Sequence, residues 1–167
     1  LILINRTDWT AATITVNATK NQVIEEITLP VDKSAFRYEG KNNSNVPKYE
    51  LIKQAFAEVY NHEVNFKAFK VDAETKLELE KLAKGTVVAI VQNKFKGVGG
   101  NSAYEVYGAD AGLVLTQNLR EVTSADNQGA FDAILKSDEN SLEPHMPKTL
   151  YLTDYATTKR IVDGLIL

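Results

Sequence analysis

The residues that most resemble a binding motif are the glycines of Phe95-Lys96-Gly97-Val98-Gly99-Gly100, which follow an apolar segment. A glycine-rich turn after a buried strand can cradle phosphate when a helix begins directly behind it, because the free N–H groups of the first helical turn then face the anion. Here Ala103–Tyr107 follows, with the composition of a strand, and the sequence contains no Gly-Lys-Ser/Thr. We therefore interpret Gly97–Gly100 as the turn of a β-hairpin.

The two histidines, His62 and His145, do not have the spacing of a metal site. Neither is followed within four residues by a second histidine or a cysteine, as a zinc pair requires. We expect His62 at the end of a helix and His145 in an exposed, proline-rich loop. Acidic residues near His145 do not match a calcium loop and are interpreted as solvated: Asp138, Glu139 and Glu143.

Other common catalytic patterns are absent from the sequence. The chain has no cysteine, which excludes disulfides, thiolate metal sites and cysteine nucleophiles. It has no Gly-x-Ser-x-Gly turn for a serine nucleophile. We therefore predict that the protein is not an enzyme and holds no cofactor and no metal ion.

The composition is that of an ordinary globular chain. It has 167 residues, 44% of them hydrophobic, and its 19 basic and 22 acidic residues give a formal net charge of −3. A nucleic-acid surface would need a basic excess or cluster, so we predict no direct readout of nucleic acid. The apolar run Thr86–Val91 is too short for a membrane span, Leu1–Ile4 is too short for the apolar core of a signal peptide, and we predict no membrane partner.

The segment around which a fold can be built is Thr86–Val91. Its five consecutive apolar residues leave no polar face, so it is predicted to be a strand covered on both sides. Val88 and Ile90 would then face one layer of the core, while Val87, Ala89 and Val91 face the other.

The rest of the sequence alternates between segments with the periodicity of an amphipathic helix and segments with the two-residue periodicity of a strand. Asn21–Leu29 fits a short helix or a strand, and Pro30 ends either one. The clearest helical pattern is Lys48–Asn61, and two further helices are predicted at Ala73–Lys84 and Tyr155–Leu165, with Asp72 and Asp154 as N-caps. Short strands are predicted at Leu1–Asn5, Ala12–Val16, Glu63–Val71, Ala103–Tyr107, Leu113–Gln117, Ala130–Lys136 and Thr149–Thr153.

This order predicts an α+β fold: an antiparallel β-sheet or small β-sandwich with two to three packed helices and an N-terminal arm. Lys41–Asn45 is a polar run between Gly40 and Pro47, which indicates an exposed loop. We place a boundary there, between an arm and loop at residues 1–45 and a main domain at residues 46–167.

Two groups of residues are candidates for a subunit interface. The first is the apolar start of the arm, which must bury its side chains against some surface. The second is a set of aromatic side chains near loops, which are common at interfaces but equally suit the edge of the domain's own core. The candidates are Leu1, Ile2, Leu3, Ile4, Trp9, Tyr104, Tyr107, Tyr151 and Tyr155.

Residues 95–167 resemble small virion structural proteins of tailed bacteriophages. The resemblance lies in Asn101–Leu113, Gly129–Leu135 and Tyr151–Lys159. It implies a non-catalytic capsid or tail component, located in a virion assembled in the host cytoplasm, whose partners are other copies of itself or other virion proteins. Within that class the sequence leaves open a capsid role, with residues 1–47 as an arm, a tail-tube role, with a hairpin at Gly97–Tyr107 or Ser124–Lys136, and a connector role.

One alternative belongs to a different class. It is a small hydrolase or ligand-binding domain with its site around Gly97–Gly100 and His145. The two hypotheses differ in what they require: the first needs exposed assembly surfaces, and the second needs these residues to meet in space.

Overall fold

The computed structural model describes residues 1–41, 44–123, 125 and 128–166. Asn42 and Asn43 of the predicted polar loop, and Ser124, Asp126 and Asn127 of the candidate hairpin Ser124–Lys136, lie outside the described residues.

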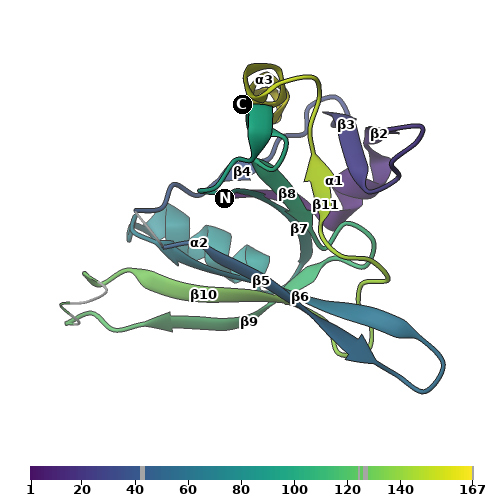
Figure 1. Cartoon of the computed structure of the whole chain (residues 1–167). Coiled ribbons are helices and arrows are strands. Elements are labelled where there is room, and N and C mark those ends of the chain that lie inside the picture. Colours follow the sequence, from purple (N-terminus) through teal and green to yellow (C-terminus); the bar gives the residue numbers. More distant parts are fainter. Residues whose placement is uncertain (42–43, 124, 126–127, 167) are drawn as a thin grey trace.

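The described residues form one large, curled sheet with three α-helices, so the α+β class is confirmed, with strands predominating (Figure 1). The strands follow the order β2-β3-β11-β8-β7-β9-β10-β6-β5, with β1 on the other side of β7 and β4 beside β1. Pairings between the described strands are antiparallel except β3 with β11. The strands are β1 (Ile2–Asn5), β2 (Thr13–Val16), β3 (Val23–Thr28), β4 (Phe36–Arg37), β5 (Val46–Lys53), β6 (Glu58–Ala68), β7 (Thr86–Gln92), β8 (Tyr104–Tyr107), β9 (Leu113–Arg120), β10 (Phe131–Ser137) and β11 (Lys148–Leu150).

Strand β7 is the centre of the fold, as its sequence predicts. Val88 and Ile90 lie in one hydrophobic cluster with residues of β3, β11 and α3, and Val87, Ala89 and Val91 lie in a second cluster with β6, β10 and α2. All five side chains are buried. Because both faces of β7 are covered by other elements, its uninterrupted apolar run exposes no hydrophobic surface to solvent.

Helices α2 (Ala73–Leu82) and α3 (Tyr155–Gly164) are confirmed together with their caps. The carboxylate of Asp72 accepts a hydrogen bond from Thr75 N–H, and that of Asp154 accepts one from Thr157 N–H. A short helix that the sequence did not predict, α1 (Arg6–Ala11), buries Trp9 against the first cluster.

The predicted helix at Lys48–Asn61 is wrong. Its residues form β5, a turn and the start of β6, in a hairpin that extends beyond the rest of the sheet (Figure 1). The apolar stripe that suits a helix is present, but β6 continues without a break into residues that pair with β10. That pairing buries Val64 and Phe66, and it fixes an extended conformation that spreads back to Glu58.

The described residues before position 45 include strands that pair with the rest of the sheet. Strand β1 pairs with β7 from Ile2↔Ile90 to Asn5↔Val87, and β3 pairs with β11. Strand β1 thereby satisfies its backbone along the free side of the central strand, where Ile2, Leu3 and Ile4 are buried. The boundary at residue 45 stays a prediction.

Candidate functional site

Among the described strands, none pairs with the outer edge of β5. The hydrogen bond from Gln54 N–H to the Ala57 carbonyl closes the hairpin, at 2.9 Å. In an antiparallel pair, the backbone groups of successive residues point alternately toward the partner strand and away from it. Since Gln54 bonds across the hairpin, the even-numbered residues of β5 direct their N–H and C=O groups toward β6, and the odd-numbered residues direct theirs outward. On β6, Tyr60 opposes Leu51, and its N–H donates away from β5 to the Glu143 carbonyl, which agrees with this alternation.

Three N–H groups therefore point outward from β5, those of Tyr49, Leu51 and Lys53. Within the described part of the chain no group accepts a hydrogen bond from them. Pro47 also lies in the outward set, where its missing N–H removes nothing from the pairing with β6. An edge strand of eight residues with free donors and acceptors is a template for a further strand.

The side chains of the hairpin are unusually apolar for so exposed an element. Tyr49 and Leu51 on one face are 47% and 46% exposed, and Val46 on the other face is similarly open. Phe56 at the turn is fully exposed. Exposed apolar residues grouped in this way on a projecting segment are typical of a protein interface.

A ladder of alternating charges crosses the sheet and ends at the open edge. Lys136 of β10 opposes Glu63 of β6, which opposes Lys48 of β5. The Lys48 ammonium lies 2.9 Å from the Glu63 carboxylate, and the Lys48 side chain is 60% exposed. On the same face Glu50 lies beside Asn61, whose amide donates to it at 3.3 Å. The ladder therefore presents a cation and an anion along the edge of β5.

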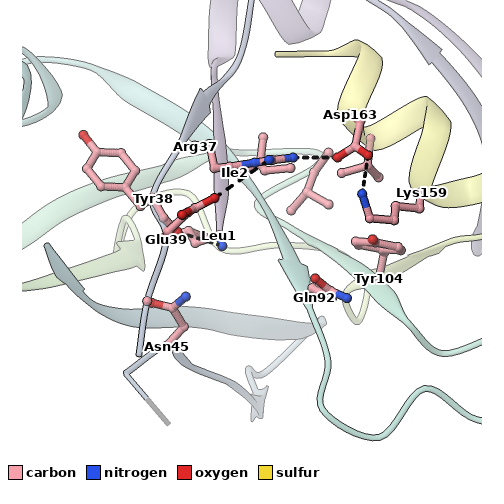
Figure 2. Close-up of a pocket in the computed structure, with 13 residues that line it drawn as sticks. Leu1, Ile2, Arg37, Tyr38, Glu39, Asn45, Gln92, Tyr104, Lys159 and Asp163 are labelled. Carbon is pink, nitrogen blue, oxygen red and sulfur yellow. Dashed lines mark hydrogen bonds and ion pairs between the residues drawn. The ribbon is translucent and has the colours of Figure 1, made fainter. Parts of the chain in front are cut away.

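A cavity of about 370 Å³ lies between β1, β4, β8 and α3 (Figure 2). Arg37 donates to the Asp163 carboxylate at 2.6 Å, and Lys159 donates to the same carboxylate. These two hydrogen bonds, with that of Lys159 the stronger influence, lower the pKa of Asp163. Both cations are thus already paired within the chain, and nothing in the cavity wall marks a particular ligand.

The loop Gly108–Gly112, between β8 and β9, is bonded to several distant parts of the chain. The carboxylate of Glu143 accepts hydrogen bonds from the N–H groups of Asp110, Ala111 and Gly112 at 3.0, 2.8 and 3.0 Å. Trp9 donates to the Ala109 carbonyl at 2.9 Å. The interpretation of Glu143 as a solvated loop residue is wrong, since it is 1% exposed and fills a nest of backbone donors.

His62 is part of the same region. It does not end a helix but lies buried in β6, where its Nδ1 accepts from Gly108 N–H at 3.1 Å and its Nε2 lies 3.0 Å from the His145 carbonyl. These partners assign the proton to Nε2 in a neutral ring. Burial lowers the pKa of His62 to about 4, against the smaller raising effect of the His145 carbonyl. A neutral, fully bonded imidazole here serves the fold.

Most of the predicted interface residues are buried within the chain. Ile2, Leu3, Ile4, Trp9, Tyr104 and Tyr107 belong to the two hydrophobic clusters, so in this structure they offer no surface to another subunit. Leu1, Tyr151 and Tyr155 are half-buried. Tyr155 stacks on Tyr104 with ring centroids 6.0 Å apart, and the Lys96 ammonium lies 4.0 Å from the centre of its other face.

The residues of the alternative ligand site lie at opposite ends of β8. Gly97–Gly100 belongs to the β7–β8 loop, where Gly100 packs against Tyr155 just before β8 begins. The backbone of His145 contacts His62, which binds Gly108 just after β8 ends. The structure therefore does not bring these two groups together. Gly97–Gly100 is the connection of an antiparallel hairpin, as predicted.

Within the described ranges, no group of three or more His, Cys, Asp or Glu side chains is arranged to hold a metal ion. None of the helices in those ranges is long and apolar enough to cross a membrane. No family model, curated protein or solved structure matches the chain.

Proposed function

We propose that this chain is a non-catalytic structural subunit of a tailed-bacteriophage virion, which assembles with copies of itself or with other virion proteins. The observation that carries the proposal is the open edge of β5, with its outward donors Tyr49, Leu51 and Lys53 and its exposed apolar side chains. Subunits of ordered assemblies commonly join by adding a strand across an interface. The resemblance of residues 95–167 supplies the class of assembly.

The projecting β5–β6 hairpin is the assembly element in this proposal. The two hairpins suggested by the sequence are less suited to it. Gly97–Tyr107 consists of a loop and β8, whose two neighbours β7 and β11 occupy both of its edges. Strand β10, at the end of Ser124–Lys136, is likewise paired on both sides, with β9 and β6. Only a strand with an unpaired side can accept another chain by backbone pairing.

Light scattering during size-exclusion chromatography, followed by electron microscopy, tests the proposal. We expect the chain to associate as its concentration rises, first into dimers and then into ring-, tube- or shell-like particles. Leu51→Pro should weaken assembly, because it removes an outward N–H while every hydrogen bond to β6 remains. Leu77→Lys is the matched control, since Leu77 on α2 is 51% exposed and lies away from the edge.

Particles that form equally well with Leu51→Pro would mean that β5 is not the assembly element. A wild-type chain that stays monomeric at every concentration would contradict the proposal itself.

A further inference from the structure

We infer that β5 pairs antiparallel with β5 of a second copy of this chain, across a two-fold axis that passes between the two Tyr49 residues. This inference rests on the proposed function, because it names the partner and the register at the same open edge. The register places Val46, Pro47, Lys48 and Tyr49 opposite Ile52, Leu51, Glu50 and Tyr49 of the partner subunit.

The backbone permits this register. Hydrogen-bonded pairs in an antiparallel ladder join residues whose polar groups both point into the interface. The two Tyr49 residues therefore exchange N–H···O bonds, and each Leu51 N–H reaches the Pro47 carbonyl of the partner subunit. Pro47 has no N–H to give in return, so it is matched as an acceptor only.

The charges distinguish this register from its neighbours. The ladder Lys136–Glu63–Lys48 ends on a cation whose side chain is 60% exposed, so an anion at the next position would continue the alternation of charges. In the inferred register Glu50 of the partner subunit takes that position, and the symmetry repeats the pair. A shift that centres the axis on Glu50 would oppose two carboxylates, and one centred on Leu51 would place Lys48 opposite Gln54 and Glu50 opposite Ile52.

The apolar side chains agree with the charges. On the face that carries Tyr49, the contacts are Tyr49 with Tyr49 and Pro47 with Leu51, and on the other face Val46 meets Ile52. Each of these pairs covers a side chain that is at least partly exposed in the single chain. Aromatic and β-branched pairs across strands are stabilising contacts.

The other end strand of the sheet order, β2, is a poorer partner for β5. It spans only Thr13–Val16 and carries no charged side chain, so it cannot continue the ladder of Lys48 and Glu50. Pairing of β5 with β2 is one of the outcomes that the following experiment separates.

The test is a charge exchange between two variants. In Lys48→Glu alone, both cross-chain pairs become Glu with Glu, and in Glu50→Lys alone both become Lys with Lys. Each variant should dimerise about tenfold to thirtyfold more weakly than wild type, by analytical ultracentrifugation. An equimolar mixture should recover most of the affinity, because the heterodimer restores two opposite-charge pairs. Thermal melting establishes that each variant is folded.

Lys94→Glu is the matched control. It makes the same change of net charge as Lys48→Glu, at an exposed position of the β7–β8 loop outside β5, and it should alter dimerisation by no more than about twofold. A comparable loss with Lys94→Glu would indicate a nonspecific effect of net charge and would overturn the inferred pairing.

Single cysteine substitutions report the register directly, since the chain has no cysteine of its own. Tyr49→Cys should form an intermolecular disulfide under mild oxidation, because a hydrogen-bonded pair brings the two Cα atoms to about 5.5 Å. Leu51→Cys should not, because four residues of offset separate its two copies by about 14 Å.

The outcomes distinguish this inference from the proposed function. Recovery in the mixture, together with an intermolecular disulfide in the Tyr49→Cys variant, supports it. Assembly without recovery, or a disulfide in the Leu51→Cys variant but not in the Tyr49→Cys variant, overturns the inferred pairing but leaves the structural role standing. A chain that remains monomeric in every experiment overturns both.

Discussion

The buried carboxylate of Glu143 provides the sharpest test of how the structure is held together. It accepts three backbone hydrogen bonds from the Gly108–Gly112 loop, at 2.8 to 3.0 Å, and its own backbone pairs with Tyr60 of β6. One side chain thus links the long β10–β11 connection to the turn between β8 and β9. We predict that Glu143→Ala and Glu143→Gln both destabilise the fold, in decreasing order of severity.

The magnitudes follow from the donors left behind. An unsatisfied buried donor costs about 1–3 kcal/mol, and Glu143→Ala leaves three N–H donors without their acceptor. Water entering the vacated space will satisfy some, so we expect a loss of about 3–5 kcal/mol in the free energy of unfolding. Glu143→Gln keeps one oxygen for Ala111 and Gly112 but turns its amide toward the N–H of Asp110, for a loss of about 1–3 kcal/mol.

Urea unfolding measures these losses with two probes. Far-UV circular dichroism follows the whole sheet, and the fluorescence of Trp9, the single tryptophan, follows the same loop because its indole donates to Ala109. Glu139→Gln is the control, since it removes one carboxylate from an exposed position of the same connection. If Glu143→Gln were as stable as Glu139→Gln within about 0.5 kcal/mol, the carboxylate would not be holding the loop, and the reasoning would be refuted.

Three further predictions concern the core, the buried histidine and the tight turn. Ile90→Ala should lower the free energy of unfolding by about 2–5 kcal/mol in chemical denaturation, because the side chain is 1% exposed in the central strand, whereas the exposed Val98→Ala should change it little. His62 has a folded pKa of about 4, below its ordinary 6.5, so the native state binds fewer protons than the unfolded chain between these values. The free energy of unfolding should therefore fall by about 3 kcal/mol as the pH is lowered from above 6.5 toward 4. Urea unfolding at a series of pH values should show a smaller fall in His62→Gln. An equal dependence on pH in the two proteins would contradict the assignment of the neutral ring to His62. Gly112→Ala should lower the free energy of unfolding by about 1–3 kcal/mol and lower the melting temperature. The reason is that Gly112 has φ +93° and that an added Cβ would lie 2.3 Å from Thr86 Cγ2. An unchanged melting temperature would show that the turn relaxes freely.

Locally encoded features could be predicted from the sequence. The apolar run of β7 has no polar face, and no neighbour is needed to see that both sides must be covered. The caps Asp72 and Asp154 bond to N–H groups three residues away, so the helix starts are determined within a single turn. The alternation of Phe131, Ala133 and Leu135 likewise identified β10 and its buried face.

The β5–β6 hairpin could not be predicted in this way, because two interpretations of the same residues are locally consistent. Leu51, Ile52, Phe56, Val59 and Tyr60 suit one face of a helix as well as a hairpin, and the turn carries no Asn-Gly or Pro-Gly signal. Pairing of β6 with β10, some seventy residues later in the chain, decides between them. The proposed assembly edge was therefore invisible until that long-range pairing was known.

The sequence by itself determined where the chain is apolar and where helices begin, since these depend on residues within one turn or one strand. Only the tertiary structure decided what each polar group meets. Glu143 resembles any other solvated acid until the loop at Gly108–Gly112 folds around it, and His62 resembles a helix end until Gly108 donates to its ring. Ile2, Leu3 and Ile4 could serve a neighbouring subunit or the chain's own core with equal hydrophobic gain, and in this structure they pair along the free side of β7, which satisfies their backbone as well as their side chains.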